Sequence, residues 1–373
     1  MVCAAAISAV CFGENTVFKS GNDGYAAYRI PAIVRAADGS LVAFAEARLG
    51  GLSDTGKIDI VAKRSEDCGK TWSAQKLVVG DGANTCGNPV PILERKSGDI
   101  VLVYCWNLGE DKEHNILNKK SKDTRKIFVI RSSDCGKTWS APADITAEVK
   151  PANATWIASG PGGGIQIDGG KFDGRLVVAV NVFTFPEKQN FAGAIFSDDF
   201  GKTWKPGKFG FCAFANESQI AQADEKTLVL NSRFHKRPIR EQKSRVVSFS
   251  EDGGESWGGS FHDAELVEPI CEGSLISVKR EGAPRLLVFA NPADPDARRN
   301  MTVRFTDAET YLKRRADSCE PACPVWKVSK VVNPDFAAYS DMEVVGGKKI
   351  GLIYESDNYG KILFEAVDIP NFK

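Results

Sequence analysis

Short apolar runs recur along the chain, separated by clusters of Gly, Asp, Asn, Ser and Pro. The runs alternate, or stay rich in Val, Ile, Leu and Phe, over lengths that suit β-strands. Examples are LVAFAEA (41–47), DIVLVYCW (99–106), RLVVAVNV (175–182), RLLVFANP (285–292) and KILFEAVD (361–368). Helical periodicity is scarce, and DAETYLKRRAD (307–317) is the best candidate for a helix. The pattern therefore predicts an all-β protein.

One eight-residue pattern, S-x-D-x-G-x-[TS]-W, occurs four times. The copies begin at residues 65, 132, 197 and 250, so they are 67, 65 and 53 residues apart, and each follows a predicted strand. In such a turn the Asp carboxylate accepts hydrogen bonds from nearby amides, the Gly adopts a positive φ and the Trp packs back on the sheet. Because the turn is self-contained and repeated, we interpret its carboxylates as structural rather than catalytic: Asp67, Asp134, Asp199 and Asp252.

Short strands at even spacing, with one aromatic-bearing motif per unit, are typical of a β-propeller. The spacing matches one four-stranded sheet with its loops, and the length of 373 residues then suggests six blades. A fold that grows by repetition can also hold this many residues in one domain. The sequence predicts a single domain over residues 1–373, a six-bladed β-propeller of four-stranded antiparallel sheets.

Charge and composition argue against several classes of partner, namely nucleic acids, membranes and metal ions. The 48 Lys and Arg residues balance 48 Asp and Glu residues, which gives no global attraction to nucleic acid or to an anionic membrane. No apolar run reaches the ~18 residues of a membrane span. Ten Cys and three His show no metal-ligand spacing, CEPAC (319–323) has no partner pair, and we predict no metal or other cofactor. The apolar stretch 1–13 reads as a strand, with a leader remnant as the alternative.

Four arginines at the ends or in the middle of apolar strands are not explained by this fold. Arg29 lies inside YRIPAIV, Arg233 ends TLVLNSR, and Arg298 and Arg299 precede another strand. Taken singly, each could be a surface cation or part of a structural ion pair. At similar places in three separate units, they would instead converge on the propeller axis. Arginine forks bind carboxylates and phosphates, so we expect a small anion there.

Three further side chains could carry chemistry at such a site. Asp54 lies in the Gly-rich segment RLGGLSDTGKID, Glu217 in CAFANESQI and Tyr339 in DFAAYSDMEV. Asp54 could equally be a turn residue, and Tyr339 a half-buried strand aromatic. The residues alone leave these alternatives open.

Taken in order, these segments resemble the exo-sialidases (neuraminidases), in the bacterial and animal branch that carries the repeated turns, known as Asp-boxes. The matching segments are YRIP, the four boxes, EAR with its Asp-bearing loop, GPGGGIQI with GRLVVAV, NES, LNSR, NP…R and YSDM…LIYE. They run from residue 17 to about residue 368, almost the whole chain.

The resemblance implies an arginine triad that grips the carboxylate of sialic acid. Arg29, Arg233 and Arg298 match the triad, and Glu355 matches the carboxylate that orients the first arginine. We prefer Arg298 to Arg299 because the family's arginine stands three residues before the first apolar residue of the strand.

The resemblance also assigns catalytic roles. Tyr339 matches the nucleophile, Glu217 the base that activates it, and Asp54 the acid/base. Arg48 matches a residue near the 4-hydroxyl of the sugar, and Asn88 is expected to face the substrate. These roles imply a retaining exo-sialidase that hydrolyses terminal sialic acids from glycoproteins, glycolipids and oligosaccharides through a covalent tyrosyl-sialyl intermediate.

Two kinds of alternative stay open. Some relatives transfer sialic acid or form an anhydro product, and others prefer a deaminated sugar. Candidate determinants are Trp156, Phe183, Phe185 and the loop TCGNPVP (85–91). An Arg in that loop would favour the deaminated sugar, whereas Asn88 is neutral.

From another class, the chain could be a non-catalytic Asp-box propeller that only binds a partner. Cellular location stays open, with a secreted, periplasmic or cell-surface bacterial protein favoured over a cytoplasmic one. A glycosylation sequon at Asn216, beside Glu217, disfavours a eukaryotic secretory route.

Overall fold

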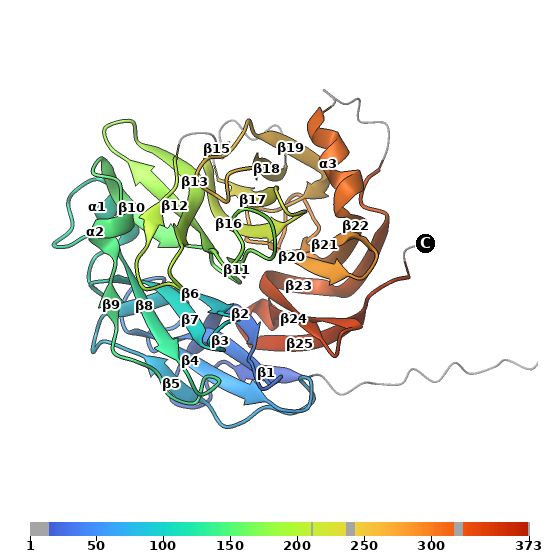
Figure 1. The fold of residues 1–373 in the computed structure, drawn as a ribbon. Coiled ribbons are helices and arrows are strands. Elements are labelled where there is room, and N and C mark those ends of the chain that lie inside the picture. The colour runs from blue at the N-terminus through green and yellow to red at the C-terminus, as the bar shows by residue number, and fades with distance from the viewer. Residues whose placement is uncertain (1–14, 210–211, 236–242, 317–323, 372–373) are drawn as a thin grey trace, which may run out of the picture.

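The computed structural model describes residues 15–209, 212–235, 243–316 and 324–371. The predicted strand or leader at residues 1–13 and the CEPAC segment fall outside these ranges. Among the described residues, the strands form four hydrogen-bonded sheets set around a central axis (Figure 1).

Strand pairing divides these sheets into six groups, read here from the innermost strand outward. The first is β2 (Ala27–Arg35), β3 (Leu41–Arg48), β4 (Ile58–Ser65) and β5 (Lys76–Val79). The second is β6 (Thr85–Leu93), β7 (Ile100–Asn107), β8 (Lys126–Ser132) and β9 (Ala143–Asp144). The third is β10 (Ala154–Ser159), β12 (Leu176–Thr184), β13 (Gln189–Ser197) and β14 (Lys205–Pro206), with the short β11 (Ile165–Gln166) and β15 (Cys212–Ala213) added.

The fourth group is β16 (Ala215–Gln222), β17 (Leu228–Phe234), β18 (Ser244–Ser250) and β19 (Phe261–Val267). The fifth is β20 (Ser274–Arg280), β21 (Ala283–Pro292), β22 (Arg299–Asp307) and the first part of β23 (Val328–Val345). The sixth is the second part of β23, then β24 (Lys349–Ser356), β25 (Lys361–Asp368) and β1 (Thr16–Lys19).

This is the predicted propeller of four-stranded antiparallel sheets, and the six groups are consistent with six blades. The strand β1 pairs with β25, so residues from the two ends of the described chain share one blade and close the ring (Figure 1). Burial follows the same plan, because separate apolar clusters fill the spaces between neighbouring sheets.

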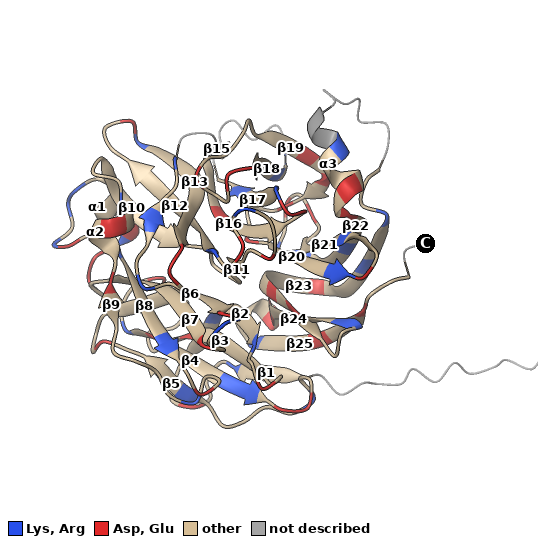
Figure 2. Cartoon of the chain, viewed as in Figure 1, with Lys and Arg blue, Asp and Glu red and all other residues tan. Residues whose placement is uncertain are grey.

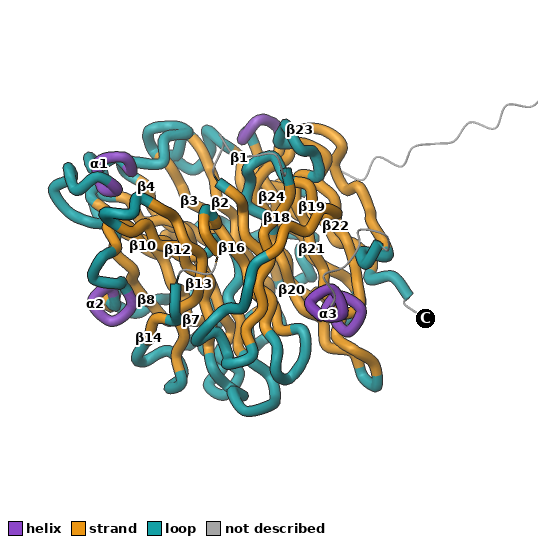
Figure 3. The backbone as a smooth tube through the Cα atoms, turned by 90° about the horizontal axis from the view of Figure 1, so that it is seen from above, coloured by secondary structure: helices purple, strands orange, loops and turns teal. Residues whose placement is uncertain are grey.

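Helices are peripheral in both views of the backbone (Figures 1 and 3). Those in the described part of the chain are α1 (Glu113–Leu117), α2 (Thr146–Val149) and α3 (Ala308–Ala316), with a 3-10 turn at Asp357–Tyr359. The predicted helix at 307–317 is confirmed as α3. No helix in the described ranges combines the length and apolarity needed to cross a bilayer. Acidic and basic residues are interspersed around the ring (Figure 2), in line with the balanced charge.

The Asp-box turns form as the sequence predicts. In the first box, Oδ1 of Asp67 accepts from the Ser65 hydroxyl at 2.8 Å and from the Thr71 amide at 2.9 Å. Its Oδ2 accepts from the Thr71 hydroxyl at 2.6 Å, and Gly69 has a φ of +84°. These bonds, first those from Thr71, lower the pKa of Asp67 to about 2. The carboxylate therefore serves its own turn.

The Trp residues of the boxes contact the preceding blade. Trp139 of the second blade meets Phe44 of the first edge-to-face, with ring centroids 5.8 Å apart. Trp72 of the first blade meets Phe364 of the sixth at 5.5 Å. Each of these rings thus links two blades, an arrangement that a turn motif alone does not predict.

The innermost strands carry irregularities near one end. Register shifts interrupt β2 between Arg29 and Ala32, β6 between Gly87 and Val90, and β23 between Ala337 and Ser340. Bulges of this kind re-aim side chains. The bulges lie at the end of the propeller opposite the Asp-boxes. The direction of β4 shows this, because β4 begins at the same end as the bulges, beside the loop of Asp54, and ends at the first box.

The segment TCGNPVP (85–91) is not a loop, contrary to the expectation from sequence. It forms most of β6, an innermost strand. Its Pro89 is tolerated because it lies within a bulge of this strand, where Asn88 has a φ of +52° and Glu46 Oε1 accepts the Asn88 amide at 2.8 Å.

Candidate active site

A cavity of about 250 Å³ opens where the bulged ends of the inner strands meet. Eight of the nine residues predicted from the sequence line it: Arg29, Arg48, Asp54, Asn88, Glu217, Arg233, Arg298 and Tyr339. The ninth, Glu355, is fully buried directly behind Arg29. A larger hollow of about 650 Å³ at the other end of the inner strands contains none of the nine.

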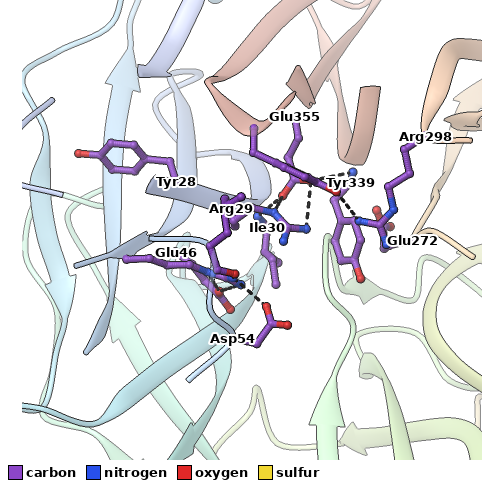
Figure 4. A network of polar contacts seen from close by, with 12 residues as sticks. Tyr28, Arg29, Ile30, Glu46, Asp54, Glu272, Arg298, Tyr339 and Glu355 are labelled. Carbon is purple, nitrogen blue, oxygen red and sulfur yellow. Dashed lines mark hydrogen bonds and ion pairs between the residues drawn. The ribbon is translucent and has the colours of Figure 1, made fainter. Parts of the chain in front are cut away.

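Glu355 holds Arg29 and two bulges in place. Its Oε1 lies 2.6 Å from Arg29 Nε and accepts the amide of Ile30 at 2.8 Å (Figure 4). Its Oε2 accepts the amide of Tyr339 at 3.2 Å. One buried carboxylate therefore connects β2 to β23 and fixes the direction of the Arg29 guanidinium.

Guanidinium groups from three blades surround Tyr339. The Cζ atoms of Arg29 and Arg298 lie 5.2 and 5.3 Å from the centroid of its ring, and Arg233 Nη1 lies 2.9 Å from its hydroxyl. Arg298 is also held by the hydroxyl oxygen of Tyr359 at 2.9 Å. Arg299 points elsewhere and pairs with Asp294 Oδ2 at 2.6 Å, with its side chain 62% exposed.

The phenol of Tyr339 is hydrogen-bonded to a carboxylate. Its oxygen lies 2.6 Å from both Oε1 and Oε2 of Glu217, and Arg233 Nη1 contacts Glu217 Oε2 at 2.8 Å. Burial raises the pKa of Tyr339 well above its ordinary value, and the charge of Glu217 adds to the rise, although Arg233 and Arg298 oppose it. The hydroxyl is therefore neutral at rest, and a base in direct contact is needed for it to attack.

Asp54 lies at the exposed rim of the cavity. Its Oδ1 pairs with Arg48 Nη1 at 2.7 Å, and its side chain is 79% exposed because it faces the open cavity. Desolvation raises the pKa of Asp54, but the charges of the Arg48 and Arg29 guanidinium groups outweigh it, so that the pKa is lowered overall. Arg48 itself is buried against Glu46, with its Nε 2.9 Å from Glu46 Oε2.

Two more acidic residues near the cavity, Glu272 and Asp341, are buried. Glu272 accepts the amide of Ser340 at 3.0 Å, Asp341 accepts the amide of Ile33 at 2.9 Å, and both accept from Gln219 Nε2 at 3.2 Å. Burial raises the pKa of Glu272 well above its ordinary value and that of Asp341 to about 7. These carboxyl groups satisfy backbone amides of the inner strands β2 and β23.

The Gly-rich segment GPGGG (160–164) packs against the side chains of Gln219 and Asp341. A Cβ at Gly162 would lie 1.7 Å from Gln219 Nε2. The glycine is required by close packing there.

Several cavity residues were not predicted. Arg125, Asn107, Asp111 and Glu113 line the wall around Asn88. Arg125 directly precedes a strand, as Arg298 does, so its position was a usable signal. Glu46 was also missed, although it interrupts an apolar strand just as Arg29 does.

Of the aromatic candidates, Trp156 lines the cavity, whereas Phe183 and Phe185 are not among its described lining residues. The residues that the structure describes contain no group of three or more His, Cys, Asp or Glu that could hold a metal ion.

Comparisons with known proteins agree with this fold. A family model described as "BNR repeat-like domain" matches residues 39–315. An exo-alpha-sialidase of Aspergillus fumigatus is 30% identical over 92% of this chain and 83% of its own length. A sialidase of Bacteroides fragilis is 28% identical over 95% of this chain, which spans 64% of that relative. The solved structure of the Hadza microbial sialidase Hz136 superposes with a TM-score of 0.82 at 28% identity, covering 95% of this chain and 68% of its own.

Fold and comparisons define a β-propeller of the glycoside hydrolase class. The chain belongs to the exo-sialidase family.

Proposed function

We propose that the protein is a retaining exo-sialidase that releases terminal sialic acids from glycoproteins, glycolipids or oligosaccharides through a covalent tyrosyl intermediate. The observation that carries this proposal is the contact of the Tyr339 hydroxyl with both Glu217 oxygens, at 2.6 Å, inside a ring of three guanidinium groups.

The arginines suit a substrate that carries its carboxylate on the anomeric carbon. Arg29, Arg233 and Arg298 each offer N–H donors, and forked guanidinium contacts recognise carboxylates. With the carboxylate held there, the anomeric carbon lies near the phenol oxygen of Tyr339. A neutral nucleophile suits this carbon, because an anionic Asp or Glu would be repelled by the neighbouring carboxylate.

In the first step, Glu217 takes the phenolic proton while Tyr339 Oη forms a bond to the anomeric carbon. The glycosidic C–O bond breaks, and its oxygen receives a proton from Asp54. In the second step, Asp54 takes a proton from water, the water oxygen bonds to the anomeric carbon, and the tyrosyl C–O bond breaks. Tyr339 recovers its proton from Glu217. Two inversions give net retention.

Asp54 must be protonated to act as the acid, yet Arg48 and Arg29 favour its ionised form in the free protein. A bound sugar acid changes this balance. Its carboxylate neutralises Arg29, and its leaving group removes water from the Asp54 carboxyl, and both changes raise the pKa of Asp54.

Release of the fluorophore from a 4-methylumbelliferyl sialoside tests the proposal. We expect turnover by the intact protein and a loss of at least about 10³-fold in kcat for Tyr339→Phe, with retained binding of a dehydrated sialic acid analogue. Tyr25→Phe is the matched control, because it removes a phenol that bonds to Asp59 outside the cavity. Near-full turnover by Tyr339→Phe would refute the nucleophile, and absence of release between about pH 4 and 8 would favour a binding module.

The same reaction separates hydrolysis from its alternatives. Proton NMR during turnover should show the α-anomer of free sialic acid as the first product, because retention places the new hydroxyl on the face of the old bond. An anhydro sugar or a sialylated acceptor as the first product would identify an intramolecular or intermolecular transferase.

A further inference from the structure

Tyr359 contacts two of the three triad arginines, although it is not among the described residues that line the cavity. The Cζ atom of Arg29 lies 4.3 Å from the centroid of its ring, and its hydroxyl oxygen lies 2.9 Å from Arg298 Nη1. The face of an aromatic ring attracts a guanidinium group, and a phenol oxygen accepts a hydrogen bond from one. One side chain therefore joins an arginine of the first blade to an arginine of the fifth.

Tyr359 and Glu355 restrict Arg29 in different ways. The oxygens Oε1 and Oε2 of Glu355 accept from Arg29 Nε and Nη2 at 2.6 and 3.2 Å, so the carboxylate holds N–H groups of the guanidinium. The ring of Tyr359 instead lies against the central carbon, Cζ. The two contacts together leave the guanidinium less freedom to swing than the ion pair alone.

The orientation of Arg298 depends more strongly on Tyr359. Its Nη1 bonds to the tyrosine hydroxyl, and its Nη2 donates to the carbonyl oxygen of Ile270 at 3.1 Å. Glu355 also attracts this guanidinium, but its short ion pair is with Arg29. The hydrogen-bond partners of Arg298 among the described residues are therefore neutral groups, and Tyr359 is the side chain among them.

The backbone of Tyr359 has an uncommon conformation. Tyr359 ends the 3-10 turn Asp357–Tyr359 between β24 and β25, and these three residues have φ values of +51°, +49° and +68°. Asp and Asn tolerate this left-handed region, whereas a bulky aromatic residue is strained there. The geometry of the turn therefore does not explain a tyrosine at this place, but the contacts of its side chain with the two arginines do.

Neighbouring groups hold this turn in place. The Ser20 hydroxyl donates to the carbonyl oxygen of Tyr359 at 2.8 Å, and the Ser20 amide donates to that of Gly360 at 2.9 Å. The ring of Phe336 meets that of Tyr359 edge-to-face, with centroids 4.8 Å apart. Ser20 directly follows β1, so the strand that closes the propeller also anchors the turn that carries the tyrosine.

We propose that Tyr359 is a positioning residue that sets the spacing of Arg29 and Arg298, so that both guanidinium groups can grip one sugar carboxylate. The inference rests on the proposed function and adds to it a residue behind the cavity wall. Tyr359 acts through the two arginines and does not itself touch the substrate. Its replacement should therefore weaken binding of the sugar acid more than it slows the chemical step.

Two substitutions separate the contacts of Tyr359. Tyr359→Phe removes only the hydroxyl, and the Kd of a dehydrated sialic acid analogue should rise by about three- to tenfold, because Arg298 loses a partner. Tyr359→Leu also removes the ring beside Arg29 and should raise this Kd by about 30- to 100-fold. For an aryl sialoside, KM should rise by similar factors while kcat falls by less than about threefold. Calorimetric titration and steady-state hydrolysis give these values.

Tyr354→Phe is the matched control. Tyr354 lies on the neighbouring strand β24, its hydroxyl bonds to Glu365, and neither residue lines the cavity. Removal of this hydroxyl should leave both Kd and KM unchanged.

A double-mutant cycle with Arg298 distinguishes positioning from a general structural role. If the hydroxyl acts through Arg298, Tyr359→Phe should change the Kd by less than about twofold in an Arg298→Ala background. An equal loss in both backgrounds would overturn the inference, as would an unchanged Kd in Tyr359→Phe alone. Should Tyr359→Leu not fold, Tyr359→Phe and the cycle decide.

The titration also keeps this inference apart from the proposed function. If the intact protein binds the analogue but cleaves no sialoside, the catalytic proposal fails, and the Kd values still decide the role of Tyr359. If the sialoside is cleaved and Tyr359→Phe binds the analogue as well as the intact protein does, the catalytic proposal stands and the inference fails. An intact protein that neither binds the analogue nor cleaves a sialoside would overturn both.

Discussion

Buried charges in this protein are gathered around one small cavity. Arg29 pairs with Glu355, and Arg48 pairs with Glu46, each inside the wall. Replacing a buried ion pair with apolar residues often leaves stability unchanged or improves it, so such pairs are poorly explained as stabilisers. Here they fix the direction of guanidinium groups before a ligand arrives, and pre-organisation of that kind lowers the cost of binding.

Neighbouring arginines give a direct test of the triad. A charge-assisted hydrogen bond contributes about 1.5–3 kcal/mol, so Arg298→Ala should reduce kcat/KM by about 10–150-fold. Arg299→Ala removes a cation that pairs with Asp294 at the surface and should change kcat/KM by less than about twofold. The measurement is steady-state hydrolysis of an aryl sialoside. Equal effects of the two substitutions would contradict the assignment of Arg298.

The acid role of Asp54 predicts a dependence on the leaving group. Asp54→Ala should lower hydrolysis of sialyllactose by about 10²–10⁴-fold, because a sugar alkoxide needs a proton to leave. A sialoside with an acidic phenol as leaving group should lose far less. Asp173→Ala, at an exposed ion pair, is the control. Equal losses on both substrates would rule out proton donation by Asp54.

The lowered pKa of Asp54 also predicts a pH profile. The free protein holds the proton of Asp54 only below the ordinary range of a carboxyl group. For a substrate that needs the acid, kcat/KM should therefore fall as the pH rises from about 4 to 7. An increase over that interval would show that another group donates the proton.

Sequence reasoning succeeded at single residues where a polar side chain interrupts an apolar strand. Arg29 was found in this way, and Glu46, in the same situation, could have been. The position of Arg125 directly before a strand marks it as a candidate but does not show what it contacts. Its meaning depends on Asn88, Asn107 and Trp156, which come from other strands of the second and third blades.

At the scale of elements, bulges on inner strands connect fold to site. Tyr339 and Arg29 lie at register shifts whose amides are satisfied by buried carboxylates. The sequence predicted the strands but not the bulges, because the bulged amides are satisfied by side chains distant in sequence. For the same reason residues 85–91 looked like a loop although they form β6.

The first Asp-box offers a matched pair of substitutions. Asp67→Ala removes the acceptor for Ser65 and Thr71 and should lower the melting temperature by about 2–5 °C. Glu66→Ala, next to it, removes a carboxylate that is 82% exposed and should have little effect. Activity at 25 °C should stay unchanged in both. A larger effect of Glu66→Ala would refute the structural role of the box carboxylate.

The Asp-box carboxylates also make the folding stability depend on pH in the acid range. Hydrogen bonds from Thr71 lower the pKa of Asp67 to about 2, and equivalent bonds outweigh desolvation to lower that of Asp134 and Asp199 to about 2. A carboxyl whose pKa is lower in the folded state stabilises the fold above its unfolded pKa and loses that effect as the pH falls. We therefore expect the melting temperature to fall between about pH 4 and pH 2, and a constant value there would contradict this.

Over the whole molecule, the ring is closed by a single short strand. β1 adds the outermost strand to the sixth blade, and its Phe18 is fully buried beside Tyr28, with ring centroids 5.3 Å apart. The repeated boxes allowed a propeller to be predicted, because four copies reveal the repeating unit. They could not show which strand closes the ring, since residues 15–20 carry no box.

Phe18→Ala tests the importance of this closure. Loss of a buried phenylalanine costs about 3–5 kcal/mol, so the melting temperature should fall well below that of the intact protein. Leu77→Ala, at a side chain that is 62% exposed, should leave it nearly unchanged. Thermal unfolding followed by calorimetry gives both values. Similar melting temperatures for Phe18→Ala and the intact protein would show that β1 is dispensable.

The central claim is that Tyr339 forms the covalent bond to the sugar. A 2,3-difluorosialic acid tests it directly, because the fluorine at carbon 3 slows both steps while the fluoride at carbon 2 leaves without help from an acid. Mass spectrometry of the digested protein should find one sialosyl adduct, on the Tyr339 side chain, and none in Tyr339→Phe. An adduct on Glu217 or Asp54, or none while the sugar is turned over, would contradict the account.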